Sequence, residues 1–318
     1  MRRLRLAIAA EESAGVKLVR ALAAGEHEIV RVFCSPSDAA VRGATVDRVA
    51  RGLDLPVEPA RRVRDPALAT ELRELGVDLL INAHSLYILA AEVVAAPTIG
   101  SFNLHPGPLP EYAGLNAPSW AIFHGASEYG VTVHWMEAGI DTGPIAFEER
   151  FPIGPDETGL SLGAACIRRG VPLLERLVAQ AAADPEAIPR RAQDLSRRRV
   201  FRRREVPFDG RIRWDEPAEV LERFVRAADF HPLRSPWGVP RASRRGTPFG
   251  IVKVAGVAAR RAEAAPGTVL GTDEGDVAEI ACGTGALRVS HVHSNGRVVR
   301  AGTVLAAGER LDDGAPSD

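Results

Sequence analysis

Residues 77–83 read VDLLINA, an almost wholly apolar run that follows a turn residue, Gly76. Two similar runs come earlier in the chain, LRLAIAA at 4–10 and EIVRVF at 28–33. Short apolar runs bounded by turn residues are typical of strands that are buried on both faces, as in a parallel sheet. We therefore expect these segments to form strands of the central sheet of an α/β domain.

Helical segments separate these runs. Residues 13–25 and 66–76 carry apolar residues at helical spacing, with Ser13 placed to cap the first helix and Gly76 to end the second. Helices that alternate with buried strands predict βαβ units. We expect a Rossmann-like, mostly parallel sheet with helices on both faces, and ligands at the carboxyl ends of its strands.

The charge balance is uneven along the chain. The 318 residues include 40 basic and 41 acidic side chains, which leaves a formal net charge of −1. Residues 1–196 hold 19 basic and 25 acidic side chains, residues 197–204 hold six arginines, and residues 205–318 hold 15 basic and 16 acidic side chains. A general nucleic-acid binder needs a basic surface, so this distribution argues against that class.

A change of composition after Asp194 indicates the domain organisation. Beyond the arginine-rich segment, one predicted helix precedes several short strands separated by turn residues, with Asn295-Gly296 as a hairpin turn. This pattern is typical of a small β-barrel. We expect a catalytic domain (1–195), an arginine-rich linker (196–210) and a C-terminal domain of one helix and an OB-like barrel (211–318).

Cysteine usage and hydropathy limit the cellular setting. Cys34, Cys166 and Cys282 are scattered and form no metal-binding pattern, so we expect free thiols in a reducing compartment and no metal. The most apolar stretch, residues 79–102, contains polar and charged residues and does not fit a membrane span. The sequence predicts a cytoplasmic protein with no membrane partner, and it assigns no oligomeric state.

Asn103 and His105 lie two residues apart at a predicted strand end, so both side chains point to the same side. An amide donor and a titratable imidazole could together stabilise a carbonyl oxygen that gains negative charge. Asp141, between Gly139 and Gly143, could orient that imidazole and raise its pKa. The alternative is that Asn103 and His105 only satisfy backbone groups of the following loop, and spacing alone leaves both interpretations open.

Two long segments carry a family resemblance. SFNLHPGPLPEYAGLNAPSWAIFHG (101–125) and GVTVHWMEAGIDTGPI (130–145) resemble the formyltransferases that use 10-formyltetrahydrofolate. The signature of that family is Asn-x-His, a leucine-proline loop, and a later Asp between glycines. The matching residues here are Asn103, His105, Leu109-Pro110 and Asp141. The resemblance extends to the first two strands and to residues 267–311, which are similar to the C-terminal barrel of the longer members.

The resemblance implies an enzyme that transfers a formyl group. A neutral primary amine would attack the formyl carbon of 10-formyltetrahydrofolate, the co-substrate, with Asn103, His105 and Asp141 as catalytic residues and no metal. The resemblance also implies a folate pocket between two segments. Its residues would be Tyr87, Ile88 and Leu89 on one side and Met136, Glu137, Ala138 and Gly139 on the other.

The identity of the amine acceptor depends on departures from the tRNA-specific members. The segment after the second strand, SPSDAAVRGATVDRVARG, is short and lacks lysine, and Ala113 stands where those members carry a basic residue. We therefore expect a small-molecule amine, either an amino sugar or an amino-acid-derived metabolite, and regard tRNA as the less favoured partner. The alternative is methionyl-tRNA formyltransferase, for which the six arginines at 197–204 are the one favourable feature.

Overall fold

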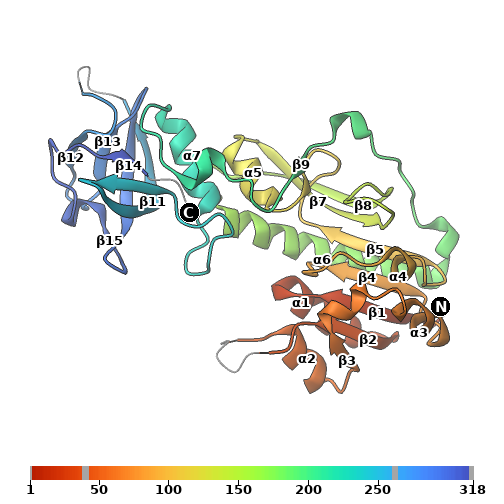
Figure 1. Ribbon diagram of the computed structural model, residues 1–318. Helices are drawn as coiled ribbons and strands as arrows, with labels where there is room; N and C mark the ends of the chain where they lie inside the picture. Colours follow the sequence, from red (N-terminus) through yellow and green to blue (C-terminus); the bar gives the residue numbers. More distant parts are fainter. Residues whose placement is uncertain (1, 38–42, 260–263, 315–318) are drawn as a thin grey trace. The chain divides into compact units, whose positions relative to one another are not determined.

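The computed structural model describes residues 2–37, 43–259 and 264–314, which form two compact units. The N-terminal unit comprises residues 1–114, 128–151 and 164–200, and the C-terminal unit comprises residues 115–127, 152–163 and 201–318. Figure 1 labels the elements of each unit. Because each unit is assembled from several segments, the contact-based units do not test the expected boundaries at 195 and 210, which stay predictions.

The N-terminal unit is built on a seven-stranded sheet with the order β3-β2-β1-β4-β5-β7-β8. Strands β1 to β5 pair in parallel along this order, and β7 runs antiparallel to β5. The expected mostly parallel sheet is therefore confirmed. Its strands are β1 (Arg5–Ala10), β2 (Glu28–Cys34), β3 (Val57–Pro59), β4 (Leu79–Ala83), β5 (Gly100–His105), β7 (Glu128–Trp135) and β8 (Ile145–Pro152).

Helices pack on this sheet. Leu68 and Leu72 of α3 share one buried cluster with Ala7, Leu80 and Val93, which come from β1, β4 and α4. On α6, Gly170 lies so close to Leu104 and Val131 that an added Cβ would come 2.6 Å from Leu104 Cδ1. The helices are α1 (Glu12–Ala23), α2 (Val46–Gly52), α3 (Leu68–Glu74), α4 (Ala91–Val94) and α6 (Gly159–Ala183), with 3-10 turns η1 (Ala60–Arg64), η2 (Pro185–Ala187) and η3 (Leu195–Arg197).

The start of α1 differs from the prediction in detail. The helix begins at Glu12, so Ser13 lies inside it and makes no cap. The preceding residue, Glu11, makes no capping bond either, because its Oε1 accepts hydrogen bonds from the backbone N and the Oγ of Ser35, both at 2.7 Å. A contact with the end of β2 therefore replaces the local cap that the sequence pattern indicated.

The C-terminal unit carries a second, antiparallel sheet with the order β12-β13-β14-β11-β10-β16, to which β15 adds beside β14. Figure 1 shows it curled, which confirms the expected barrel-like domain. Asn295 and Gly296 both have positive φ values, 49° and 76°, in the predicted hairpin between β14 and β15. The elements are α5 (Ala117–Phe123), η4 (Pro207–Gly210), α7 (Ala218–Ala228), β10 (Arg241–Arg244), β11 (Thr247–Ala258), β12 (Val269–Thr272), β13 (Ala278–Ala281), β14 (Ala286–Ser294), β15 (Arg297–Arg300), η5 (Ala301–Thr303) and β16 (Asp312–Asp313).

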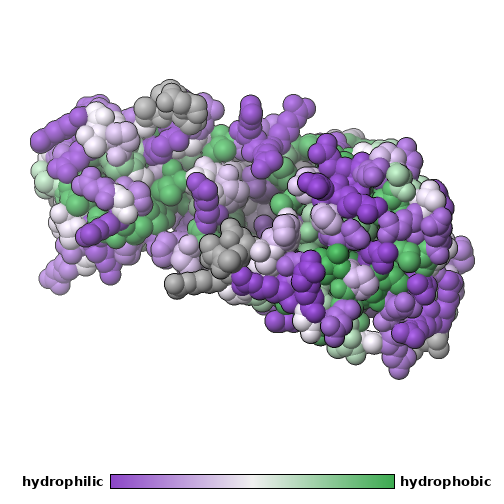
Figure 2. All heavy atoms as spheres, turned by 60° about the horizontal axis from the view of Figure 1, so that its bottom comes forward, coloured by the Kyte–Doolittle hydropathy of each residue, from purple (hydrophilic) through white to green (hydrophobic). Residues whose placement is uncertain are grey.

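Two short strands, β6 (Ala113–Gly114) and β9 (Val200–Phe201), pair with each other. None of the helices described has the combination of length and apolar character that crossing a membrane requires. In the view of Figure 2, hydrophilic residues cover much of the outline of each unit, with smaller apolar areas between them.

The parallel sheet makes a direct prediction about stability. Leu80 is completely buried in β4, and Leu80→Ala should lower the free energy of unfolding by about 2–5 kcal/mol, because the cavity it leaves cannot collapse fully. Leu53, with 44% of its surface exposed, provides the matched control, and Leu53→Ala should cost less than about 1 kcal/mol. Urea unfolding followed by circular dichroism measures both, and equal losses would contradict the assigned core.

Candidate active site

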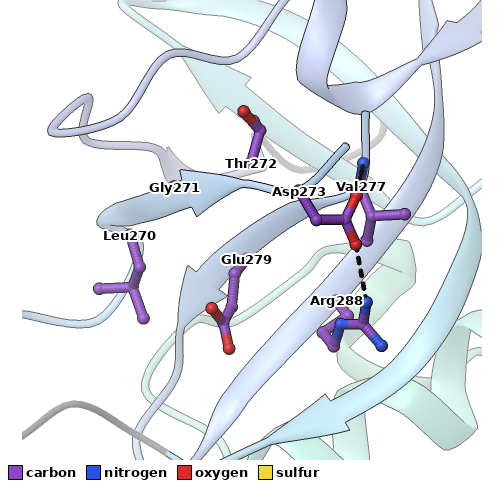
Figure 3. Close-up of a pocket in the computed structure, with 7 residues that line it drawn as sticks. All are labelled: Leu270, Gly271, Thr272, Asp273, Val277, Glu279 and Arg288. Atoms are coloured by element: carbon purple, nitrogen blue, oxygen red, sulfur yellow. Dashed lines mark hydrogen bonds and ion pairs between the residues drawn. The ribbon is translucent and has the colours of Figure 1, made fainter. Parts of the chain in front are cut away.

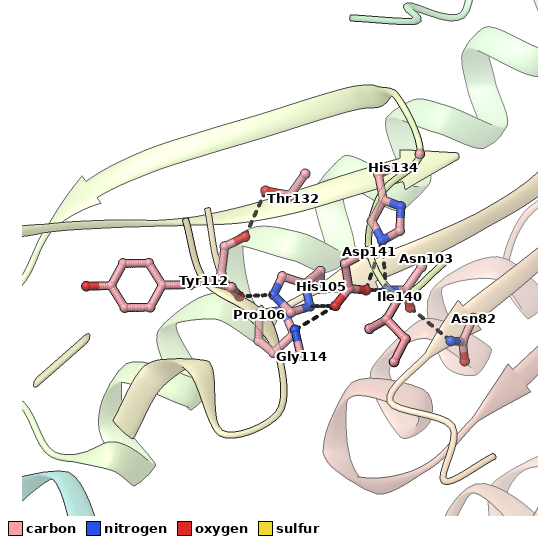
Figure 4. A network of polar contacts seen from close by, with 12 residues as sticks. Asn82, Asn103, His105, Pro106, Tyr112, Gly114, Thr132, His134, Ile140 and Asp141 are labelled. Carbon is pink, nitrogen blue, oxygen red and sulfur yellow. Dashed lines mark hydrogen bonds and ion pairs between the residues drawn. The ribbon is translucent and has the colours of Figure 1, made fainter. Parts of the chain in front are cut away.

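A row of three polar side chains crosses the carboxyl end of the sheet. Asn82 on β4 stands opposite Asn103 on β5, and Asn103 stands opposite His134 on β7. The Asn82 Nδ2 donates to Asn103 Oδ1 at 2.9 Å, and Asn103 Nδ2 lies 3.0 Å from His134 Nε2 (Figure 4). These contacts hold the Asn103 amide in one orientation, with its NH₂ group toward β7.

His134 determines in which direction the hydrogen bonds of this row are donated. Its side chain is only 3% exposed, and its Nδ1 lies 2.8 Å from the backbone oxygen of Trp135. Since a carbonyl oxygen only accepts, Nδ1 carries the proton, and in the neutral ring Nε2 is left to accept from Asn103. Asn103 is therefore the donor in its contact with His134.

His105 is held between two acceptors. Its Nε2 donates to the backbone oxygen of Tyr112 at 2.6 Å, while its Nδ1 lies 3.6 Å from Asp141 Oδ2. Thr132, opposite His105 on β7, donates to the backbone oxygen of Gly107 at 2.8 Å and so shapes the loop that folds over the imidazole. The imidazole is thereby fixed in both position and tilt.

Asp141 joins two loops to the strands. Its Oδ2 accepts from the backbone N of Gly114 at 2.8 Å, and its Oδ1 lies 3.4 Å from both Asn103 Nδ2 and His134 Nε2. Its backbone has a φ of 54°, in the left-handed region that non-glycine residues seldom adopt. Figure 4 shows the carboxylate turned toward the imidazole and the Asn103 amide. The three residues predicted to be catalytic thus lie together, on β5 and on the loop after β7.

The electrostatics of this group correct one expectation. Burial lowers the pKa of His105 more than the neighbouring Asp141 carboxylate and the Tyr112 carbonyl raise it, so its net pKa lies below the ordinary value. The expected raising effect of Asp141 is present, but desolvation of the ring is larger. Burial of Asp141 acts to raise its own pKa, yet the neighbouring His105 and the hydrogen bond from the Gly114 amide act in the opposite direction, and that pKa lies well below the usual range.

The predicted folate residues occupy two kinds of environment. Leu89 belongs to a buried cluster of the N-terminal unit, and Tyr87 and Met136, from the two sides of the predicted pocket, are partly buried and pack against that cluster. Ile88 leaves 78% of its surface exposed, and the residues after Met136 are exposed as well, namely Glu137, Ala138 and Gly139. Apolar side chains from both predicted segments thus lie in or against the core while their sequence neighbours are exposed, and the assignment of these residues to folate stays a prediction.

Sequence reasoning missed two members of the row. Asn82 received no role, although it is the one amide in an otherwise apolar strand and lies near its carboxyl end. His134 received no catalytic role either, yet its Nε2 contacts the Asn103 amide. Pairing β5 with β7 in antiparallel register would have placed His134 opposite Asn103, but that register is not visible in a single sequence.

Other polar features in the described residues carry less chemistry. His84 and Glu12 both have positive φ values, 60° and 57°, and their side chains approach to 3.2 Å. Within the described ranges, no group of three or more His, Cys, Asp or Glu side chains is arranged to hold a metal ion. A depression of about 370 Å³ in the C-terminal unit (Figure 3) is lined in part by Asp273 and Arg288, which pair with each other at 2.8 Å.

Comparison with known proteins identifies the family. Residues 2–175 match the formyl transferase family, and residues 206–310 match the C-terminal domain of formyl transferases. The chain therefore belongs to the formyl transferase family, in its two-domain form, and is a formyltransferase.

Two relatives and one solved structure show where in the family its similarities lie. The methionyl-tRNA formyltransferase of Roseiflexus castenholzii is 35% identical over 306 residues, which cover 92% of this chain and 94% of the relative. That of Xanthomonas campestris pv. campestris is 34% identical, with coverages of 92% and 94%. An N-formyltransferase from Helicobacter canadensis, solved with folinic acid and dTDP-3-aminofucose, has a TM-score of 0.69 at 18% identity and covers 90% of this chain and 98% of its own.

These similarities correct the expected acceptor. Relatives named methionyl-tRNA formyltransferase match nearly the whole chain at 34–35% identity, whereas at 18% identity the sugar enzyme shows only the fold. The expectation of a small-molecule amine, with tRNA as the less favoured partner, is therefore wrong. The net charge was a poor guide to the acceptor, because nucleic-acid binding depends on local positive charge. Arg202, Arg203 and Arg204 are all exposed and provide such a local charge. Part of the lysine-free segment, residues 38–42, lies outside the described residues.

The geometry around Asp141 predicts that the pKa of His105 depends on the Asp141 carboxylate. In the Asp141→Asn variant the pKa of His105 should fall further, because the variant removes a negative charge that favours the imidazolium while burial persists. Titration of the histidine ring signals by NMR measures this pKa. Asp65→Asn, which changes an exposed carboxylate, serves as the control and should leave His105 unaffected. A pKa that stayed constant or rose in Asp141→Asn would contradict the assigned electrostatics.

Proposed function

We propose that this protein transfers the formyl group of 10-formyltetrahydrofolate to the amino group of methionine carried on tRNA. The observation that carries the proposal is the 35% identity to a methionyl-tRNA formyltransferase over 92% of this chain and 94% of that relative. The buried group formed by Asn103, His105 and Asp141 supports it with a suitable site chemistry. The cytoplasmic location expected from the sequence accompanies this proposal as a prediction.

The reaction places clear demands on the site. Transfer requires a neutral amine to bond to the formyl carbon, the bond from that carbon to N10 of the folate to break, and a proton to pass from the amine to N10. Between these events the formyl oxygen carries negative charge. Stabilisation of that charge by fixed donors is the main contribution that a protein can make to such a step.

Asn103 and His105 are the donors that we assign to this charge. The Asn103 amide is already oriented by Asn82 and His134, and its second N–H, whose nitrogen lies 3.4 Å from Asp141 Oδ1, is the one left to turn to the formyl oxygen. His105 is neutral at neutral pH because its pKa is lowered, and its one N–H, on Nε2, donates to the Tyr112 oxygen. His105 therefore donates to the formyl oxygen by exchanging that contact for the substrate.

Asp141 has a different part in this proposal. Its carboxyl remains ionised across the neutral range because its pKa is well below the usual value. An ionised carboxylate beside the imidazole can hold the attacking amine by a hydrogen bond and can orient a water molecule that carries the proton from the amine to N10 of the folate. In this proposal Asn103 and His105 stabilise the formyl oxygen, and Asp141 helps to move the proton.

The residues predicted for the folate fit the chemistry of that co-substrate. Tyr87, Leu89 and Met136 form an apolar floor, and a flat heteroaromatic ring needs such a surface together with accessible backbone groups. Ile88 and Glu137, one from each predicted segment, are exposed. The family relationship, the donors Asn103 and His105, and the apolar side chains of the two predicted segments together support 10-formyltetrahydrofolate as the formyl source.

The acceptor can be tested by direct comparison. With 10-formyltetrahydrofolate present, the purified protein should formylate methionyl-tRNA, and a nucleotide-linked amino sugar should give no comparable rate. Affinity for the tRNA should fall steeply with salt, because phosphate contacts release counterions. Radiolabelled formyl transfer at increasing salt measures both effects. Formylation of the amino sugar alone would overturn the proposal.

The assigned residues lead to a second test. Asn103→Ala and His105→Ala should each lower kcat by about 10²–10³-fold, the usual result of removing a donor to a developing oxyanion. His293→Ala, which changes an exposed histidine on β14, is the matched control and should keep wild-type kcat. Initial-rate measurements with methionyl-tRNA decide, and near-normal turnover in either site variant would remove that residue from the mechanism.

A further inference from the structure

Residues 189–200, which we call the strap, return along the N-terminal unit after α6 and η2. The strap begins at the end of β7, where Trp135 Nε1 donates to the backbone oxygen of Pro189 at 2.8 Å and the Arg190 guanidinium lies 4.0 Å from the centre of the Trp135 ring. Arg191 and Ile145 then exchange two backbone hydrogen bonds, at 2.8 and 3.0 Å. The strap is therefore attached to the sheet on both sides of the loop that carries Asp141.

Gln193 reaches from the strap to this loop. Its Nε2 donates to the backbone oxygens of Asp141 at 2.9 Å and of Gly143 at 2.6 Å, which uses both of its N–H groups. Its Oε1 is buried and has no hydrogen-bond partner among the described residues. If the Gln193 amide were flipped, its Oε1 would face the two backbone oxygens of Asp141 and Gly143, and three acceptors would meet without a donor. The amide orientation with Nε2 toward these oxygens is therefore the favourable one.

The second half of the strap holds both loops of the site. Arg198 donates to the backbone oxygen of Ile140, the residue before Asp141, and Arg197 pairs with Glu111 in the other loop. The backbone of Arg199 exchanges hydrogen bonds with the second loop, accepting from Ala113 N at 2.9 Å and donating to Pro110 O at 3.2 Å. The arginines expected to form part of a linker therefore include three that contact the loops around His105 and Asp141.

The Asp141 loop depends on such external contacts. Asp141 is held at a φ of 54°, a left-handed conformation that is unfavourable for a non-glycine residue and persists only when the surroundings enforce it. Gly143 is packed so tightly that an added Cβ would lie 1.9 Å from the Trp135 oxygen. The two backbone oxygens that Gln193 binds belong to these two residues, so its amide acts at the constrained part of the loop.

We propose that Gln193 is a positioning residue for Asp141, and that the strap is an integral part of the active site. Gln193 contacts only the backbone of the loop, so it acts through the placement of the Asp141 carboxylate and takes no part in bond making. The inference rests on the proposed function, because its kinetic test uses formyl transfer to methionyl-tRNA.

The first experiment compares Gln193→Ala and Gln193→Glu with Gln180→Ala. Both Gln193 variants should lose about 10- to 100-fold in kcat, the effect of a small misplacement of a catalytic group, while the KM for methionyl-tRNA changes little. Gln193→Glu nearly preserves size but turns a carboxylate oxygen toward two carbonyl oxygens. Gln180 also binds a backbone oxygen, that of Asp184 at 3.1 Å, and its variant should keep wild-type kcat. Wild-type kcat in both Gln193 variants would overturn the inference.

The second experiment separates positioning from general damage to the fold. If Gln193 acts through Asp141, adding Gln193→Ala to Asp141→Asn should cause little further loss of kcat, whereas fully additive losses would overturn the inference. NMR titration without substrates gives a readout that does not depend on the acceptor. Gln193→Ala should lower the pKa of His105, the direction also expected for Asp141→Asn, and an unchanged His105 pKa would count against the inference.

These measurements also separate the two proposals. A wild-type protein that fails to formylate methionyl-tRNA defeats the proposed function, while the His105 titration still tests Gln193. Conversely, an active wild type whose Gln193 variants match it in kcat and in His105 pKa defeats only the role of Gln193.

Discussion

The carboxylate of Asp141 is the point at which the strands and the loops of the site are joined. It accepts a hydrogen bond from the backbone N of Gly114, faces His105 and Asn103 on β5, and lies beside His134 on β7. A buried carboxylate is costly unless several partners compensate for the lost hydration. The Gly114 amide and the Asn103 side chain both direct N–H groups at this carboxylate, and these contacts help to keep the charge stable inside the protein.

The part of the site that lies on a strand could be predicted from the sequence. The alternation of a strand is local, so Asn103 and His105 were placed on one face from their spacing alone. The parallel sheet and the Asn295-Gly296 hairpin followed for the same reason, since apolar runs and turn residues act within a few positions. Asp141 was a candidate because of its glycine-bracketed loop, and the family resemblance then assigned it to the same site, because no local rule provides its proximity in space.

What could not be predicted depends on contacts between distant segments. The roles of Asn82 and His134 require the register of three strands, and the contact of Gln193 with Asp141 joins residues 52 positions apart. The lowered pKa of His105 depends on how deeply the ring is buried, whereas the sequence indicated only the opposing effect of the carboxylate. Net charge likewise averages over the surface, and so it favoured the wrong acceptor.

The hydrogen bonds from Asn82 through Asn103 to His134 run in one direction, because the Trp135 oxygen holds the proton of His134 on Nδ1. The Asn103 amide at the centre of the row is therefore fixed from both ends. If either the Asn82 donor or the His134 acceptor were removed, the two orientations of that amide would be less clearly distinguished, and the site would lose a donor that stands ready before any substrate binds.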